Sequence, residues 1–155
     1  MLPKTRIVPS TPSLVLTAME DAYTAKDSVG YTRLFDAAYQ GLSFNPNDPG
    51  VPRIDFNWAD EQLHIQKLAE KPTITTISLN FGLNVTWYSD LGDPPGWATI
   101  QRKSSASTLS ITDGDNTYIL PNDDLIEFKL IPTTPAPSSV TDTTWKIIRW
   151  TETHP

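Results

Sequence analysis

The sequence predicts an α+β fold, with helices packed on one face of a curved antiparallel sheet. The first observation is that apolar residues recur at helical spacing in three stretches between residues 11 and 70. The second is that apolar and polar residues alternate with a period of two after Pro72. Helices followed by a run of strands are typical of α+β domains. The 155 residues contain no internal repeat and fit a single domain over residues 11–155, preceded by an extended leader over residues 1–10.

Local signals place the predicted helices. Thr11 is a suitable N-cap for the first helix, with Pro12 at the first helical position, where its missing N–H costs nothing. A second helix is predicted over residues 28–39, because its apolar side chains share one face. A short strand and a loop rich in Asn, Pro and Gly come next. The third helix is predicted over residues 56–70, with Asn57 as its cap.

Four strands are predicted after the helices. The longest alternation, over residues 73–90, predicts a long antiparallel strand with one buried face. A strand over residues 97–112 is joined by the hairpin turn "DGDN" to one over residues 117–132. The apolar phase shifts within the first of these and Pro121 interrupts the second, which predicts a bulge or a strong bend. The last strand is predicted over residues 143–152, "TTWKIIRWTE".

Composition and motifs exclude several classes of protein. The net charge is −6 and the basic residues are scattered singly, which argues against a nucleic-acid partner. The chain has no cysteine, which excludes disulfide frameworks, thiolate catalysis and iron–sulfur clusters. No apolar run approaches the roughly 20 residues needed to span a bilayer. The acidic turns lack the spacing of calcium loops, and no zinc, nucleotide or serine-hydrolase motif is recognisable, so we expect no metal and no cofactor.

The start of the chain bears on localisation. The leader "MLPKTRIVPSTP" has no apolar h-region and is therefore not an intact signal peptide. Together with a surface rich in Thr, Ser and Asn, it favours an exported bacterial protein from which the signal has been removed. The compartment itself stays open, because an exported protein can lack disulfides.

Four stretches of the chain carry a family resemblance: "AMEDAYTAKDSVGYTRLF", "LSFNPNDPG", "FNWADEQ" and "WKIIRW". With the order of elements, they resemble the nuclear transport factor 2-like superfamily, and in particular a subgroup of uncharacterised bacterial members. The resemblance implies a cone-shaped sheet packed against three N-terminal helices, with a partly apolar cavity between them. Residues 121–124, "PNDD", depart from it, because continuous strand is expected there. It does not imply one function, since the superfamily includes isomerases, dehydratases, cyclases, transport adaptors and assembly modules.

The resemblance suggests candidate catalytic residues. Members that resemble ketosteroid isomerase or the polyketide cyclases use an Asp or His base and hydroxyl or acid donors inside the cone. In this chain, His64 is a candidate base, and Tyr23 and Tyr31 are candidate donors to a carbonyl oxygen. The same residues also fit a boundary histidine half in solvent and two core tyrosines with hydrogen-bonded hydroxyls. An enzyme requires these side chains to meet within hydrogen-bond reach in one pocket.

The cavity is expected to be lined by Tyr23, Tyr31, Trp58, Phe81, Arg102, Trp145 and Arg149. Strict alternation places Arg149 on the same face as Trp145, where an inward arginine would bind a carboxylate or pair with Glu127. Trp58 also fits a simple anchor for the third helix.

Our first interpretation is a non-catalytic domain that binds a small apolar or carboxylate ligand. The spacing of the acidic and basic residues in the sequence does not bring a catalytic acid and base together in the cavity. The alternatives are an isomerase or dehydratase acting on a small enolisable substrate, and a homodimer formed through the sheet face.

Overall fold

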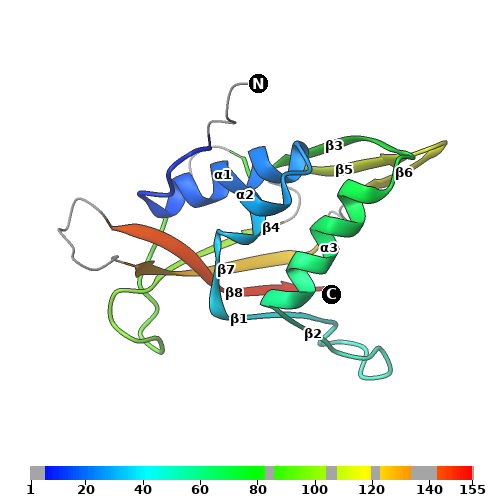
Figure 1. The fold of residues 1–155 in the computed structure, drawn as a ribbon. Coiled ribbons are helices and arrows are strands. Elements are labelled where there is room, and N and C mark those ends of the chain that lie inside the picture. The colour runs from blue at the N-terminus through cyan, green and yellow to red at the C-terminus, as the bar shows by residue number, and fades with distance from the viewer. Residues whose placement is uncertain (1–5, 83–85, 104–107, 120–122, 134–142, 155) are drawn as a thin grey trace.

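The computed structural model describes residues 6–82, 86–103, 108–119, 123–133 and 143–154. The elements are α1 (Pro12–Thr24), α2 (Ser28–Thr32), β1 (Phe35–Phe44), β2 (Ile54–Asn57), α3 (Trp58–Glu70), β3 (Ile74–Asn80), β4 (Ala98–Lys103), β5 (Thr108–Asp113), β6 (Asn116–Ile119), β7 (Leu125–Thr133) and β8 (Thr144–Thr153). In Figure 1, α1 and α2 lie beside each other, and α3 runs between β2 and the region of β5 and β6. The predicted α+β class is confirmed. Among the described residues, no helix is long and apolar enough to cross a membrane.

The described strands form two hydrogen-bonded sheets, one in the order β2-β1-β8-β7-β4 and the other in the order β3-β5-β6. Neighbouring strands are antiparallel, except that β1 and β8 are parallel. β4 and β7 belong to the larger sheet, whereas β5 and β6 belong to the smaller one. The chain therefore changes sheet between β4 and β5, and again between β6 and β7. These two places coincide with the predicted phase shift and with Pro121, which itself lies outside the described residues.

The predicted starts of the first and third helices are confirmed. The side chain of Thr11 caps α1 by accepting a hydrogen bond from Leu14 N at 3.2 Å. Asn57 caps α3 in a capping box, since its Oδ1 accepts from Asp60 N at 2.9 Å while Asp60 Oδ2 accepts from Asn57 N at 2.8 Å. Because each cap involves only residues that are close in sequence, the pattern alone was enough to predict it.

The second helix is shorter than predicted. α2 ends at Thr32, and β1 begins at Phe35. The reason is a partner from the far end of the chain, because Phe35 pairs in parallel register with Ile147 of β8. The prediction of helix over residues 33–39 is therefore wrong, and Tyr39 is a buried residue of a strand.

The long strand predicted over residues 73–90 is interrupted. β3 ends at Asn80, whose side-chain oxygen accepts a hydrogen bond from Gly82 N at 2.6 Å. Gly82 has a φ of 84°, in the left-handed region that favours glycine and ends a strand. Residues 83–85 lie outside the described part of the chain, and Tyr88 then forms an isolated bridge to β4.

β8 contains a bulge at Ile148. Lys129 of β7 pairs with Arg149, and the next residue, Leu130, pairs with Ile147, so Ile148 is an extra residue on β8. A shift of one residue exchanges the two faces of a strand. The last strand lies where it was predicted, but its faces after Ile147 are the reverse of those that strict alternation predicts.

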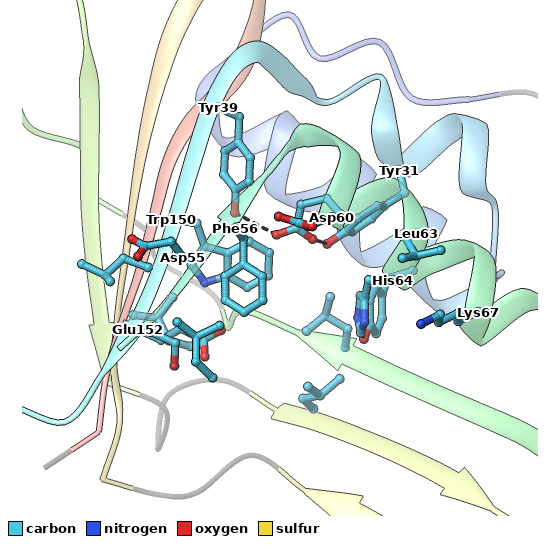
Figure 2. Close-up of a pocket in the computed structure, with 18 of the residues that line it drawn as sticks. Tyr31, Tyr39, Asp55, Phe56, Asp60, Leu63, His64, Lys67, Trp150 and Glu152 are labelled. Atoms are coloured by element: carbon cyan, nitrogen blue, oxygen red, sulfur yellow. Dashed lines mark hydrogen bonds between the residues drawn. The ribbon is translucent and has the colours of Figure 1, made fainter. Parts of the chain in front are cut away.

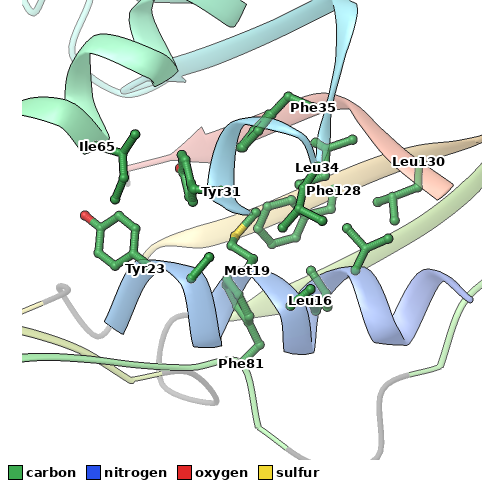
Figure 3. Packing of buried hydrophobic residues seen from close by; sticks show 14 of the residues in the cluster. Leu16, Met19, Tyr23, Tyr31, Leu34, Phe35, Ile65, Phe81, Phe128 and Leu130 are labelled. Carbon is green, nitrogen blue, oxygen red and sulfur yellow. The ribbon is translucent and has the colours of Figure 1, made fainter. Parts of the chain in front are cut away.

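One hydrophobic core joins the helices to both sheets (Figure 3). Phe81, which directly follows β3, meets Phe128 of β7 edge to face, with ring centroids 5.3 Å apart. The apolar side chains that are almost fully buried include Val15, Met19, Tyr31, Leu34, Phe35, Ile65, Phe128, Leu130 and Ile147. α1 therefore packs with the apolar stripe that its sequence predicted facing the sheets.

Residues 6–10 have no regular structure, but they contact the rest of the protein. The guanidinium of Arg6 pairs with the carboxylate of Asp27 at 2.9 Å. The backbone of Pro9 accepts a hydrogen bond from Trp145 N at 2.8 Å. This part of the leader is held against α2 and β8.

Candidate functional site

A cavity of about 720 Å³ lies between α3 and the inner faces of the two sheets. In Figure 2, Asp60 and His64 of α3 lie on one side, and Trp150 and Glu152 of β8 lie on the other. Much of the wall is apolar, with side chains such as Leu42, Leu79, Leu109, Ile111 and Ile126. Polar groups are gathered on α3, β1 and the end of β8.

Glu61 is the most buried acidic side chain of the cavity wall, only 8% exposed. Its Oε2 accepts a hydrogen bond from the Tyr31 hydroxyl at 3.0 Å, and its Oε1 accepts one from the Tyr39 hydroxyl at 2.8 Å (Figure 2). Burial raises the pKa of Glu61, because the charged form loses water, although the two tyrosine hydrogen bonds oppose that effect. We call Glu61, Tyr31 and Tyr39 the carboxylate cluster.

The two tyrosines of the carboxylate cluster act as donors. Burial raises the pKa of both Tyr31 and Tyr39, and the nearby negative charge of Glu61 raises each further. Both phenols therefore stay protonated at neutral pH, and each donates a hydrogen bond to the carboxylate. Hydrogen bonds to an ionised group are shorter and stronger than neutral ones, so the cluster fixes the position of Glu61.

A second polar pair lies one helical turn further along α3. The hydroxyl of Tyr23 and Nε2 of His64 are 2.9 Å apart, and the donor depends on the histidine tautomer. Tyr23 is buried, whereas His64 is exposed. Partial burial lowers the pKa of His64, so its imidazole is neutral at pH 7. The structure thus makes His64 a boundary residue that reaches a buried tyrosine.

Glu152 enters the cavity wall from β8, beside Trp150. Burial raises the pKa of Glu152, and the negative charges of Asp124 and Glu61 raise it further, while His154 opposes them. The nearest basic nitrogen, His154 Nε2, is 3.8 Å from the carboxylate. Glu61 and Glu152 both belong to the wall of this cavity.

Three of the seven residues expected to line the cavity do so: Tyr23, Tyr31 and Phe81. Trp58 packs against the core instead, and its indole Nε1 donates to Thr32 O at 3.2 Å, as an anchor for α3 would. Arg102 does not belong to the cavity wall, and its Nη2 donates to the backbone oxygen of Phe81 at 3.0 Å.

The other two expected lining residues, Trp145 and Arg149, also lie outside the cavity wall. Trp145 packs against the core near the leader. The bulge turns Arg149 to the opposite face of the sheet, where its guanidinium lies 5.7 Å from the ring centre of Trp97. Arg149 Nη1 also donates to the backbone oxygen of Ile148 at 2.7 Å. Neither arginine is therefore placed to bind a carboxylate in the cavity.

Sequence reasoning missed Glu61, Tyr39, Trp150 and Glu152. Glu61 lies three residues after Trp58 and four before Ile65, on the inner stripe of α3. An acidic residue on an apolar stripe is the signal that could have identified it. Within the described residues, no group of three or more His, Asp or Glu side chains is placed to hold a metal ion.

Comparison with known proteins identifies the fold. No family model and no curated protein sequence matches the chain. Solved structures do match it. An NTF2-like protein with a cystatin-like fold from Novosphingobium aromaticivorans superposes with a TM-score of 0.55 at 11% identity, over 90% of this chain and 76% of that one. The chain therefore has an NTF2-like, cystatin-like fold, and the fold that the sequence resemblance implies is confirmed.

Two other solved structures show the same fold. ActVI-ORFA from Streptomyces coelicolor superposes with a TM-score of 0.58 at 12% identity, over 90% of this chain and 91% of that one. A protein of unknown function from Mycobacterium tuberculosis superposes with a TM-score of 0.57 at 13% identity, over 91% of this chain and 72% of that one. At such identities the likeness extends to the fold alone.

Proposed function

We propose that this protein binds a small, largely apolar molecule in the cavity between α3 and the sheets. The observation that carries this proposal is the cavity itself, which has a volume of about 720 Å³. Pockets for small molecules are typically of roughly 300–1,000 Å³, mostly apolar, with a few polar groups that fix orientation. The carboxylate cluster and the Tyr23–His64 pair supply such groups.

Exposed apolar side chains at the edge of the cavity support the same proposal. Ile54 and Phe56 of β2 and Leu63 of α3 are 52%, 37% and 49% exposed, and all three belong to the cavity wall. A bound molecule that reaches them would remove their apolar surface from water, which is favourable. We propose an apolar rather than a carboxylate ligand, because Arg102 and Arg149 do not reach the cavity.

The binding proposal is tested with Nile red, a neutral dye that becomes fluorescent in apolar sites. We expect saturable binding to the wild type, and loss of binding in Leu109→Trp, which fills the cavity. Leu91→Trp is the matched control, because Leu91 is fully exposed and does not line the cavity. Equal dye binding by both variants would show that the dye binds elsewhere and would contradict the proposal.

A second candidate function is an enzyme that moves a proton on a small enolisable substrate. The observation that favours it is that Tyr23, His64 and the carboxylate cluster all border one cavity. The carboxylate of Glu61 would take a proton from the α-carbon of a ketone, and the C–H electron pair would pass into an enolate. The hydroxyl of Tyr23 would donate to the enolate oxygen.

The enzymatic candidate is tested by proton exchange. We expect the wild type to accelerate loss of the α-proton signals of cyclic ketones in D₂O, followed by NMR, and Glu61→Gln to abolish the acceleration. Glu70→Gln is the control, because it makes the same change on the exposed end of the same helix. If no ketone exchanges faster with wild type than with buffer, the enzymatic candidate fails and the binding proposal remains.

A homodimer through the sheet face and export from a bacterial cell also remain proposals. The sheet face that carries Arg149 is partly covered by an ion-pair group in which Lys129 contacts Asp90 at 3.0 Å and also contacts Asp93. Such a polar surface favours a small interface over a large apolar one. Light scattering after size-exclusion chromatography distinguishes a monomer from a dimer.

A further inference from the structure

The cavity wall contains more acidic than basic residues. Asp55, Asp60, Glu61 and Glu152 are acidic, whereas Lys67 is the basic residue of the wall that is charged at neutral pH. His64 adds no positive charge at pH 7, because partial burial lowers its pKa. The wall therefore carries more negative than positive charge in an otherwise apolar space.

The acidic groups differ in how well they are already compensated. Asp55 is exposed and pairs with Arg53 at 2.9 Å, and Asp60 is exposed and caps α3. The partners of Glu61 are two phenols, which carry no charge, and Glu152 lies beside the uncharged indole of Trp150, with His154 Nε2 at 3.8 Å. Glu61 and Glu152 are thus the two carboxylates that a bound positive charge would stabilise most.

Glu61 also has hydrogen-bonding capacity to spare. A carboxylate has about four acceptor sites on its two oxygens, and each oxygen of Glu61 accepts one bond from a phenol. The N–H groups of an ammonium match the sites that remain. A carboxylate ligand offers only further acceptors and would be repelled.

Aromatic rings form much of the remaining wall, including Tyr23, Tyr31, Tyr39, Phe56, Phe81 and Trp150. The face of an aromatic ring is the negative part of its quadrupole and attracts an organic cation. Carboxylates together with ring faces are a combination that recognises ammonium groups, whereas an apolar pocket for a neutral ligand needs no acidic group.

We infer that the ligand is an organic cation, a protonated or quaternary amine on an apolar body, with its charge near Glu61 and Glu152 and its body along the aromatic wall. This inference rests on the proposed binding function. It assigns a charge class to the ligand, which the cavity volume alone does not.

The experiment compares probes that share one chain and differ in the charge of the head group. Octylammonium, 1-octanol and octanoate are titrated into the protein by calorimetry at pH 7.5 and low salt. We expect octylammonium to bind roughly tenfold more tightly than 1-octanol, and octanoate to bind most weakly. Each of Glu61→Gln and Glu152→Gln should reduce the preference for octylammonium over 1-octanol several-fold.

Glu70→Gln is again the matched control, since it removes one negative charge from α3 outside the cavity wall. It should leave the preference unchanged, which separates a local effect from attraction to the net charge of −6. Equal affinity for octylammonium and 1-octanol, or tighter binding of octanoate, would overturn the inference and leave the binding proposal intact. If none of the three probes binds, both fail.

Discussion

Replacing Tyr39 with phenylalanine tests the carboxylate cluster directly. The substitution removes one hydroxyl, which donates to Glu61 Oε1 at 2.8 Å from a side chain that is 2% exposed. The ring itself stays, with its edge-to-face contact to Phe35 at 4.7 Å, so little packing is lost. The change therefore isolates one buried hydrogen bond to a carboxylate.

The expected loss follows from the kind of bond. A hydrogen bond to a charged group contributes about 1.5–3 kcal/mol to the free energy of unfolding. For a chain of this size, about 1 kcal/mol changes the melting temperature by roughly 2–4 °C. Tyr39→Phe should therefore melt about 3–12 °C lower than the wild type.

Urea denaturation at pH 8, followed by circular dichroism, measures the loss. Tyr118→Phe is the matched control, because Tyr118 is 58% exposed, and it should change the unfolding free energy by less than about 0.5 kcal/mol. In a Glu61→Met background the effect of Tyr39→Phe should nearly vanish, since the acceptor is already gone. If Tyr39→Phe is neutral in the wild type, or costs as much without Glu61, the bond does not hold the cluster.

Three other predictions concern pH, ligand binding and backbone conformation. Burial raises the pKa values of Glu61 and Glu152 in the folded protein, so the folded protein binds protons at a higher pH than the unfolded chain does. Both groups therefore increasingly favour folding as the pH falls toward about 4.3, the pKa of a glutamate in the unfolded chain. Urea titrations at pH 7 and pH 5 should show a smaller gain, or a larger loss, in unfolding free energy for Glu61→Gln than for the wild type; an equal change would contradict the assignment. Arg149→Gln should leave the affinity for Nile red within about twofold, because Arg149 faces away from the cavity, and a larger loss would place it at the site. Gly114→Ala should cost about 1–2 kcal/mol in thermal unfolding, because Gly114 has a φ of 60° and nothing within 4 Å of an added Cβ, whereas Gly92→Ala should be nearly neutral; equal effects would show that backbone conformation is not the cause.

The parts of the fold that were predicted correctly depend on neighbours in sequence. Thr11 and Asn57 cap their helices through residues three positions away, and the turn between β5 and β6 is a two-residue hairpin with glycine in the left-handed region. The α+β class follows from the order of such local patterns. A single sequence contains all the information that these features need.

The sequence predictions that were wrong concern residues whose structure depends on a partner far away in the chain. Residues 33–39 have helical spacing, but pairing with Ile147 draws Phe35 into a strand. The candidate site shows the same limit, since Glu61 becomes a buried acceptor only because Tyr31 and Tyr39 arrive from α2 and β1. The sequence makes His64 and Tyr23 equal candidates for the cavity, and only the structure shows that Tyr23 is buried whereas His64 is exposed.

The bulge at Ile148 makes the residue count of β8 part of the site. Side chains after the bulge, including Trp150 and Glu152, border the cavity only because one extra residue precedes them. Deleting that single residue would keep the chemistry of every other side chain and still exchange the inside and the outside of the strand's end. When the sequences of distant relatives are aligned with this one, a one-residue gap in the last strand therefore matters more to the lining of the cavity than most substitutions do.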